Sequence, residues 1–312
     1  MDASVIIVTR NTAAMTATAI RSVLAGRDLP ALEILVVDNG STDDTPLTLP
    51  REFPPIQFIR SEKNLGFARA VNLAASKATG EFLLLLNSDA QPVSDALAKA
   101  ITWMRANPAC AVAGGQLLNP DGSRQNSIAN FPTLATELLN KSLLRRLWPG
   151  KYPGKERAAP GPREVETVIG AFMLIRRSVW NALGGLDERY FFFFEETDFC
   201  LQARARGYRV MHLPDIQIQH GQGQTAKQVS VGVRIEYWRS RYLYFARHRS
   251  VPARMFLVAG LLLRLLVDWL AAGLCCLFTF GSSPRWRERW RTCSALVAWH
   301  LRGRPSDAGL PK

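Results

Sequence analysis

Short apolar runs rich in β-branched residues alternate with segments of helical periodicity, and this alternation constrains the fold more than any other feature. The apolar runs cover residues 5–8, 33–37, 56–59 and 82–86, and the helical segments cover residues 12–25, 67–77 and 91–107. Runs of this length indicate strands buried on both faces, and their alternation with helices indicates a parallel sheet covered on both sides. We therefore predict an α/β fold with a mostly parallel, Rossmann-like sheet.

Polar residues follow three of these predicted strands. They are Thr9-Arg10-Asn11, Asp38-Asn39-Gly40-Ser41 and Asn87-Ser88-Asp89. In open parallel sheets ligands bind beyond the carboxyl ends of the strands, so these clusters predict a ligand site at one sheet edge. Further along, we predict a strand over 168–176, a helix over 195–206, and short strands over 209–213 and 216–220.

The positive charge is concentrated at the end of the chain. The net charge is +13, of which residues 227–312 carry +11. Residues 255–280 are strongly apolar, and Arg264 and Asp268 within them are spaced to pair on one helix face. Tryptophans 269, 286, 290 and 299 punctuate this region as interfacial anchors would.

We expect this basic, apolar region to lie on an anionic membrane surface without spanning it, because two charges near its middle are costly in hydrocarbon. Packing of the apolar segment on the rest of the chain, or in a homodimer, remains an alternative. A nucleic-acid partner is not expected, because no nucleic-acid-binding module is recognisable. The five cysteines lack metal-ligand spacing and no signal peptide is evident, which favours a reducing, cytoplasmic location.

Several short motifs occur in a recognisable order. They are Val8-Thr9-Arg10-Asn11, Val37-Asp38-Asn39-Gly40-Ser41, Asn64-Leu65-Gly66-Phe67, Asn87-Ser88-Asp89, Gly170-Ala171-Phe172, Gly185-Leu186-Asp187-Glu188, Glu195-Glu196-Thr197-Asp198 and His220. The set resembles family 2 glycosyltransferases over about residues 3–248, and most of all the rhamnosyltransferase-type branch that builds bacterial surface polysaccharides. The resemblance implies a GT-A fold, a nucleotide-diphosphate sugar donor, a divalent metal and inverting chemistry.

The resemblance also assigns a nucleotide-sugar-binding set. Its members are Thr9, Asn11, Asp38, Asn64, Arg69, Asn72 and Asn87. An ionised carboxylate accepts well from the N3–H of a pyrimidine, which suits Asp38 at the end of its strand. The alternatives are that Asp38 only caps a turn and that Arg69 forms a surface ion pair.

Metal ligation is predicted for Asp89 and His220. Family members often carry the acidic motif Asp-x-Asp here. In this chain the motif reads Asn87-Ser88-Asp89, so its first position is an asparagine. A single strong carboxylate leaves the cation dependent on donor phosphates, which suits Mg²⁺ or Mn²⁺. A structural role is the alternative for a lone histidine such as His220.

The general base is expected among the acidic residues that open the helix at 195. Glu196 matches the family's base, Glu195 is its competitor, and crowding of these carboxylates should raise at least one pKa. Simple compensation of the helix dipole is the alternative. The acceptor side is expected to include Gly170, Ala171 and Asp198.

These inferences predict a catalytic domain over 1–233, with a nucleotide-binding half about 1–115 and an acceptor half about 165–233, followed by a helical basic region over 234–312. The predicted function is inverting transfer of a sugar, rhamnose from dTDP-rhamnose, onto a hydroxyl of a glycan or lipid-linked acceptor. The expected location is the cytoplasmic face of the bacterial inner membrane, held peripherally. Alternatives are a UDP-hexose or UDP-N-acetylhexosamine transferase, and a non-catalytic protein that binds nucleotide sugars or nucleic acid.

Overall fold

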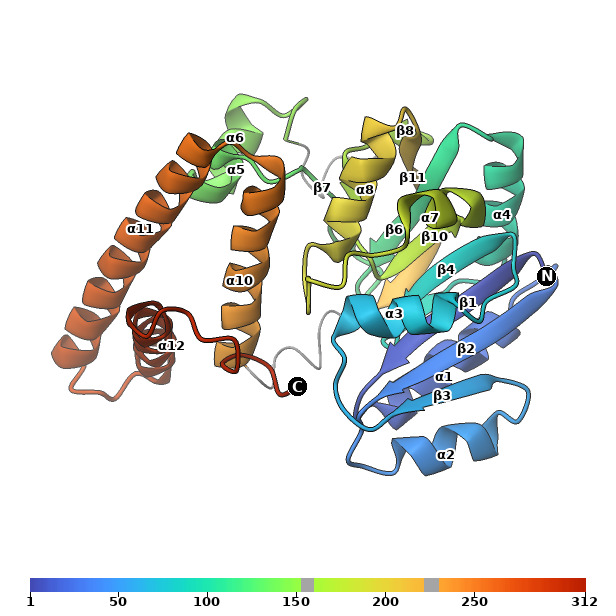
Figure 1. The fold of residues 1–312 in the computed structure, drawn as a ribbon, viewed down its shortest axis with the longest axis horizontal. Coiled ribbons are helices and arrows are strands. Elements are labelled where there is room, and N and C mark those ends of the chain that lie inside the picture. The colour runs from blue at the N-terminus through green and yellow to red at the C-terminus, as the bar shows by residue number, and fades with distance from the viewer. Residues whose placement is uncertain (153–159, 222–229) are drawn as a thin grey trace. The chain divides into compact units, whose positions relative to one another are not determined.

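The protein divides into two compact units. The computed structural model describes residues 1–152, 160–221 and 230–312 (Figure 1). The sheet unit consists of Met1–Phe131 and Arg145–Gln224, and the helical unit consists of Pro132–Leu144 and Thr225–Lys312. The short segment at 132–144 therefore belongs to the helical unit, although it lies far upstream of the rest of that unit in the sequence.

The sheet unit is built on one large mixed sheet with the strand order β3-β2-β1-β4-β10-β6-β11-β5. Its strands are β1 (Ala3–Thr9), β2 (Leu32–Asn39), β3 (Gln57–Ser61), β4 (Phe82–Asn87), β5 (Ala90–Pro92), β6 (Cys110–Leu118), β10 (Phe172–Arg176) and β11 (Arg209–His220). The first four strands run parallel, as does the β6–β11 pair, whereas β10 lies antiparallel between β4 and β6. The predicted mostly parallel sheet is confirmed. β8 (Arg163–Glu164) pairs with β11, while β7 (Ile128–Ala129) and β9 (Thr167–Val168) form a small separate sheet.

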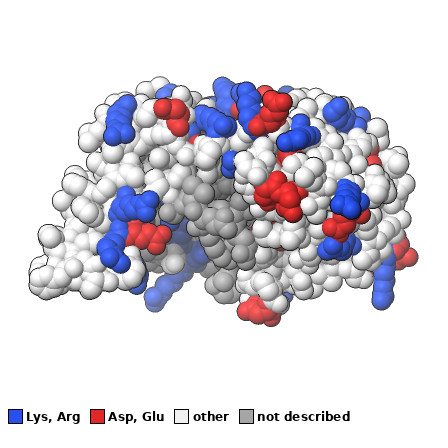
Figure 2. All heavy atoms as spheres, turned by 90° about the horizontal axis from the view of Figure 1, so that it is seen from below, with Lys and Arg blue, Asp and Glu red and all other residues white. Residues whose placement is uncertain are grey.

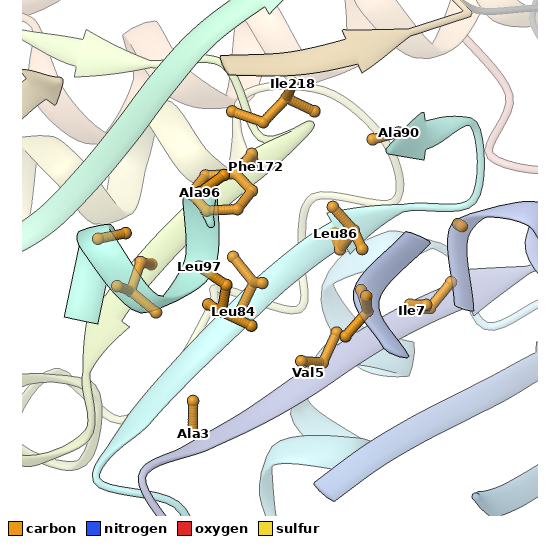
Figure 3. Close-up of a cluster of buried hydrophobic side chains, with 14 of the residues drawn as sticks. Ala3, Val5, Ile7, Leu84, Leu86, Ala90, Ala96, Leu97, Phe172 and Ile218 are labelled. Carbon is orange, nitrogen blue, oxygen red and sulfur yellow. The ribbon is translucent and has the colours of Figure 1, made fainter. Parts of the chain in front are cut away.

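Helices cover both faces of this sheet (Figure 1). They are α1 (Ala13–Leu24), α2 (Thr45–Glu52), α3 (Phe67–Ala75), α4 (Ala96–Ala106), α7 (Arg177–Leu183) and α8 (Glu195–Ala205). Successive strand residues face opposite sides. On β1, Val5 and Ile7 join α1 and α4 in one core (Figure 3), and Ile6 joins α3 and α8 in the other. Burial on both faces explains why the strands are apolar throughout.

Two predicted elements differ from the structure. The helix expected from residue 91 begins only at Ala96, because residues 90–92 form β5 and pair antiparallel with β11. The strands expected at 209–213 and 216–220 are one strand, β11, whose register against β6 shifts between Leu213 and Gln217. Pro214 interrupts the strand pattern in the sequence. In the structure the strand bends at this position and continues.

The helical unit contains α5 (Leu134–Leu138), α10 (Ser230–His248), α11 (Val251–Phe278) and α12 (Pro284–Leu301), and α6 (Lys141–Leu147) begins in it. The 28-residue α11, which contains an 18-residue stretch with a mean hydropathy of 2.0, is long and apolar enough to cross a bilayer. Arg264 and Asp268 do not pair as expected, because Asp268 instead pairs with Arg289 of α12 at 2.8 Å. The tryptophans also differ from expectation, since Trp299 is buried whereas Trp290 is exposed.

Candidate active site

The two predicted metal ligands meet at the carboxyl edge of the sheet. Asp89 lies in the turn between β4 and β5, and His220 is the last residue of β11. Pairing of His220 with Ala90 in the β5–β11 ladder brings the His220 Nε2 atom to 3.3 Å from Asp89 Oδ1. The amide of Asn87 lies 3.5 Å from the same nitrogen. The side chains of Asp89 and His220 are only 14% and 10% exposed, so the pair is largely shielded from water.

Gln125 sets the orientation of the His220 ring. Its Nε2 donates to the His220 carbonyl at 2.7 Å and to Asn119 Oδ1 at 2.8 Å. Its Oε1 therefore faces His220 Nδ1, at 2.9 Å, and accepts a hydrogen bond from it. In the neutral ring this leaves the lone pair on Nε2, the nitrogen that faces Asp89. No motif in the sequence marks Gln125, which the sequence analysis missed.

This arrangement fits a divalent cation. A neutral Nε2 and a carboxylate oxygen are both acceptors, and two acceptors at 3.3 Å repel unless a proton or a cation lies between them. Neighbouring ligands of a cation bound at about 2.1 Å lie about 3 Å apart, close to the distance seen. Among the residues that the structure describes, no group of three or more His, Cys, Asp or Glu side chains surrounds a metal position. Two protein ligands leave the remaining coordination to water and to donor phosphates.

The loop after β2 contains the predicted nucleobase acceptor. Asp38 Oδ1 accepts from the Ser41 backbone at 3.1 Å, which is the turn cap considered above. Its Oδ2 is buried and has no hydrogen-bond partner within the described part of the chain. That second oxygen is available for a nucleobase N3–H, but Asp38 is 0% exposed, so a base must displace covering atoms to reach it.

Asn11 and Thr9 support this loop from β1. Asn11 accepts from the Thr42 backbone at 2.8 Å through Oδ1, and its own backbone N–H donates to Ser41 Oγ at 2.9 Å. Thr9 is buried, and its hydroxyl lies 2.8 Å from those of Thr12 and Thr16. The Thr9 hydroxyl therefore belongs to a buried threonine cluster, and lining of the nucleotide pocket by Thr9 stays a prediction.

The loop before α3 is tied to the end of β2 by side-chain amides. Asn39 donates to Asn64 Oδ1 at 2.9 Å and accepts from the Leu65 backbone at 2.7 Å. Asn64 Oδ1 also accepts from the Gly66 backbone at 3.1 Å. Gly66 has a φ of +80°, and a Cβ there would lie 2.5 Å from the Phe191 carbonyl oxygen, so only glycine fits. Asn64 shapes the loop, and Asn39 is a second residue that the prediction missed.

Two members of the predicted nucleotide-binding set are used elsewhere. Arg69 is largely exposed, and its Nε lies 3.6 Å from Glu188, which matches the surface ion-pair alternative. Asn72 donates to the Leu186 carbonyl at 2.8 Å and accepts from the Leu186 backbone at 3.0 Å. Both ends of its amide therefore hold the turn at 185–188, and the nucleotide contact of Asn72 stays a prediction.

The acidic residues of α8 begin directly after a strained backbone. Phe193 and Phe194 have φ values of 72° and 73°, a region that bulky L-residues rarely adopt. Their conformation starts α8 at Glu195, which is 4% exposed. Burial, with the nearby Glu196 carboxylate, raises the pKa of Glu195 well above its usual value, and burial raises the pKa of Glu196. The predicted effect of crowding therefore applies to Glu195, whereas burial alone raises the pKa of Glu196.

Glu196 is the better placed of the two bases. It is partly exposed and lies against Gly170, where a Cβ would stand 3.7 Å from Glu196 Cγ. The adjacent Ala171 carbonyl accepts from the Asn87 backbone at 3.1 Å, so Glu196 and the Asp89 turn belong to one edge of the sheet. Glu195, in contrast, has a buried Oε2 with no hydrogen-bond partner among the described residues.

Asp198 is an internal residue of α8. It is 0% exposed, and its carboxylate accepts from the Tyr190 hydroxyl at 3.2 Å and from Gln202 at 2.6 Å. Its carboxylate is thus bonded within the sheet unit, and a contact of Asp198 with the acceptor stays a prediction. Asp198 instead anchors the segment before α8 to the helix, which helps to hold Glu195 and Glu196 in place.

We expect Glu195→Gln to stabilise the sheet unit at neutral pH. The pKa of the Glu195 carboxyl is higher in the folded protein than in the unfolded chain, so the folded protein binds this proton more tightly. As pH rises above about 4.5, the unfolded chain ionises at a lower pH than the folded protein, and the wild type loses stability. Each kcal/mol regained raises the melting temperature by about 2–4 °C. Thermal melts at pH 4 and pH 8 test this, with a difference expected only at pH 8. An equal difference at both pH values would contradict the assigned cause.

The sequence profile of Glycosyl transferase family 2 matches residues 4–184, more than half of the chain. The chain belongs to glycosyl transferase family 2. This glycosyltransferase is 28% identical over 256 residues to the N-acetylglucosaminyl-diphospho-decaprenol L-rhamnosyltransferase of Mycobacterium tuberculosis. The aligned region covers 75% of this chain and 82% of that relative. It is also 28% identical over 92 residues to the rhamnosyltransferase WbbL of Escherichia coli, over 30% of this chain and 35% of WbbL.

Solved structures share its fold. The mannosyltransferase PcManGT from Pyrobaculum calidifontis, in complex with GDP-Man and Mn²⁺, superposes with a TM-score of 0.55 at 20% identity, covering 96% of this chain and 86% of its own. Staphylococcus aureus TarS 1-349 in complex with UDP gives a TM-score of 0.53 at 19% identity, over 84% and 71% of the two chains. The predicted GT-A fold is confirmed.

Proposed function

We propose that this glycosyltransferase moves rhamnose from dTDP-rhamnose onto a hydroxyl of a glycan or lipid-linked acceptor, with inversion at the anomeric carbon. The observation that carries the proposal is the shared sheet edge, where an accessible glutamate of raised pKa and the Asp89–His220 pair are linked through Gly170 and Ala171. The similarity to rhamnosyltransferases supports the choice of sugar and a polyprenyl-diphosphate-linked acceptor.

In the proposed reaction the acceptor oxygen attacks the anomeric carbon from the face opposite the diphosphate. The new carbon–oxygen bond forms as the bond to the phosphate oxygen breaks, and the nucleotide diphosphate leaves with the electron pair. Glu196 takes the proton of the attacking hydroxyl. Its raised pKa favours this transfer, because a base with a pKa closer to the working pH holds the proton more readily.

Asp89 and His220 would hold the divalent cation, Mg²⁺ or Mn²⁺, against the donor diphosphate. The cation supplies positive charge for the phosphate oxygens of the leaving group. By accepting from Nδ1–H, Gln125 would select the neutral tautomer whose Nε2 lone pair is aimed at the site. The fold neighbour solved with a GDP-sugar and Mn²⁺ supports a metal of this class.

The test is a donor screen read by release of nucleotide diphosphate. dTDP-rhamnose is compared with UDP-hexoses, UDP-N-acetylhexosamines and GDP-mannose, with Mg²⁺, Mn²⁺ or excess chelator. The product with a synthetic polyprenyl-diphosphate glycan acceptor is checked for anomeric configuration. Preference for a UDP-sugar would overturn the rhamnose assignment. Donor binding without turnover on any acceptor or water would favour a non-catalytic binding protein.

We propose in addition that the helical unit holds the enzyme on the cytoplasmic face of the bacterial inner membrane. One side of α11 is buried along Leu257, Leu261 and Leu265, while most of the rest of its surface is apolar and exposed, with Arg254, Arg264 and Asp268 as its charged residues. The exposed side chains include Met255, Phe256, Leu262, Leu263, Leu266, Val267, Leu270, Leu274, Leu277 and Phe278. A helix with such a surface beside many basic residues suits the membrane interface.

A peripheral position fits the charges better than a span. Spanning would carry Arg264 and the Asp268–Arg289 pair into hydrocarbon, which is costly. Nucleic acid is disfavoured as the anionic partner, since basic and acidic side chains are interspersed on the face shown in Figure 2 rather than separated.

We expect the full-length protein to float with anionic vesicles at low salt and to be released by high salt with alkali. Each basic residue near the surface adds about 1 kcal/mol of attraction, and the exposed α11 side chains add apolar burial. Flotation assays measure this, with Leu263→Gln/Leu266→Gln as the variant that weakens apolar insertion. Protein that stays soluble and sediments as a dimer would assign the α11 surface to a dimer seam. Release only by detergent would assign a span.

A further inference from the structure

The helical unit contains a cavity of about 990 Å³ that is rich in basic side chains. It is lined by α5, the start of α6, α10, α11 and α12. The basic lining residues are Lys141, Arg234, Arg241, Arg264, Arg285 and Arg289, and the acidic ones are Glu137, Asp268 and Glu288. The lining therefore carries an excess of three positive charges.

Two of the three carboxylates already have partners. Glu137 lies 3.4 Å from Arg241, and Asp268 lies 2.8 Å from Arg289. Across the described residues, Lys141, Arg234, Arg264 and Arg285 form no ion pair. Four solvent-exposed cations thus surround one remaining carboxylate at this cavity, and their local excess of positive charge would favour an anion there.

Arg241 is held rigidly at the wall of this cavity. The residue is 7% exposed, and its guanidinium lies 5.0 Å and 4.8 Å from the ring centres of Tyr237 and Trp238. Its Nε is buried and has no hydrogen-bond acceptor within the described part of the chain. A buried donor without a partner costs free energy, and a guanidinium matches the geometry of phosphate oxygens.

The position of the cavity relative to the α11 surface agrees with a lipid headgroup as the source of that anion. Leu261, Arg264 and Leu265 of α11 line the cavity, while Leu262, Leu263 and Leu266 of the same helix are exposed. A helix is about 10 Å thick, so apolar side chains at the acyl boundary would leave its other side at the depth of the headgroups.

We propose that this cavity binds the phosphate or diphosphate group of a membrane lipid. The proposal rests on the membrane association proposed above, and it adds a defined site to general electrostatic attraction. A bilayer phospholipid and the diphosphate of a polyprenyl lipid share this chemistry, as does free inorganic diphosphate, so the test contains an arm for each.

The experiment compares two variants of equal charge in the full-length protein. Arg234→Gln/Arg285→Gln removes two cavity arginines without breaking an ion pair. Arg287→Gln/Arg291→Gln removes two arginines of α12 that are solvent-exposed, as Arg234 and Arg285 are, but that do not line the cavity. Binding is measured by flotation on phosphatidylcholine vesicles alone, with 25% phosphatidylglycerol, or with 5% polyprenyl diphosphate, and thermal shift is measured with inorganic diphosphate.

We expect the cavity variant to lose about tenfold or more in vesicle affinity relative to the control variant, as two charge-assisted hydrogen bonds would predict. Inorganic diphosphate should raise the melting temperature of the wild type and the control, but not of the cavity variant. Stronger loss on polyprenyl diphosphate than on phosphatidylglycerol would identify the diphosphate lipid, and equal loss on both would identify a general phosphate site.

Equal loss in the two variants would overturn the site and leave only surface attraction. If the wild type binds no vesicle, the proposed membrane association is wrong. If inorganic diphosphate then raises the melting temperature of the cavity variant as much as that of the wild type, the anion site is wrong as well. Vesicle binding that survives in the cavity variant, with loss of binding to a short DNA duplex, would reassign the cavity to nucleic acid. None of these results depends on turnover, so the proposed sugar transfer is judged separately by the donor screen.

Discussion

Replacing Glu196 by glutamine should lower turnover by about 10²–10⁴-fold while donor affinity stays within a few-fold of the wild type. A general base typically contributes a factor of this size, and the amide keeps the volume of the side chain against Gly170. Steady-state kinetics with a saturating acceptor, together with calorimetric titration of the donor, measures the two effects separately.

The pH profile provides the control for this assignment. A base must be ionised, and burial raises the pKa of Glu196, so kcat/KM of the wild type should fall on the acid side at a pH above the range of an exposed glutamate. The residual activity of Glu196→Gln should lack this limb. Near-normal turnover in Glu196→Gln, with collapse in Glu195→Gln, would move the base to Glu195.

Replacing Asp89 by alanine should abolish the metal dependence of donor binding. Asp89 is the carboxylate of the proposed metal pair, and its loss leaves His220 Nε2 with no second protein ligand in the described part of the chain. Calorimetric titration of donor with and without Mn²⁺ tests this. Metal dependence equal to that of the wild type would remove Asp89 from the site.

Two further variants should reduce the metal dependence of donor binding by smaller amounts. His220→Ala should weaken the metal dependence less than Asp89→Ala, because a neutral ligand contributes less than a charged one. Gln125→Met removes the acceptor for Nδ1 and should lower metal affinity about 10–100-fold, the usual effect of a supporting hydrogen bond. An unaffected Gln125→Met protein would mean that the ring is oriented by other contacts.

The central sheet could be predicted because its signal is local. The apolar β-branched runs of β1, β2 and β4 are read directly from the residues that form them, and their polar ends point to the ligand edge. β5 could not be read in this way. Its three residues are a strand only because β11 pairs with them from more than a hundred residues away, and tertiary pairing of that kind leaves no periodic trace in the sequence.

The site shows the same division. The roles proposed for Asp89, His220 and Glu196 follow from side-chain type and motif order. Gln125 acts through one hydrogen bond to His220, and Asn72 through the turn at 185–188, so their roles depend on which partner the fold supplies. Side-chain chemistry alone does not distinguish an asparagine that binds a nucleotide from one that holds a turn.

Formation of the β5–β11 ladder also determines when, during folding, the proposed metal site is assembled. Asn87 and His220 are 133 positions apart, and only the register that sets His220 opposite Ala90 brings the ring beside Asp89. A slip of one residue would turn His220 to the opposite face of the sheet. Because pairings so distant along the chain close late, a ribosome-bound chain that has not yet released residue 220 cannot hold the cation. Once the ladder has closed, the proposed cation and donor would stabilise it by mass action, so the substrate would protect the enzyme from unfolding.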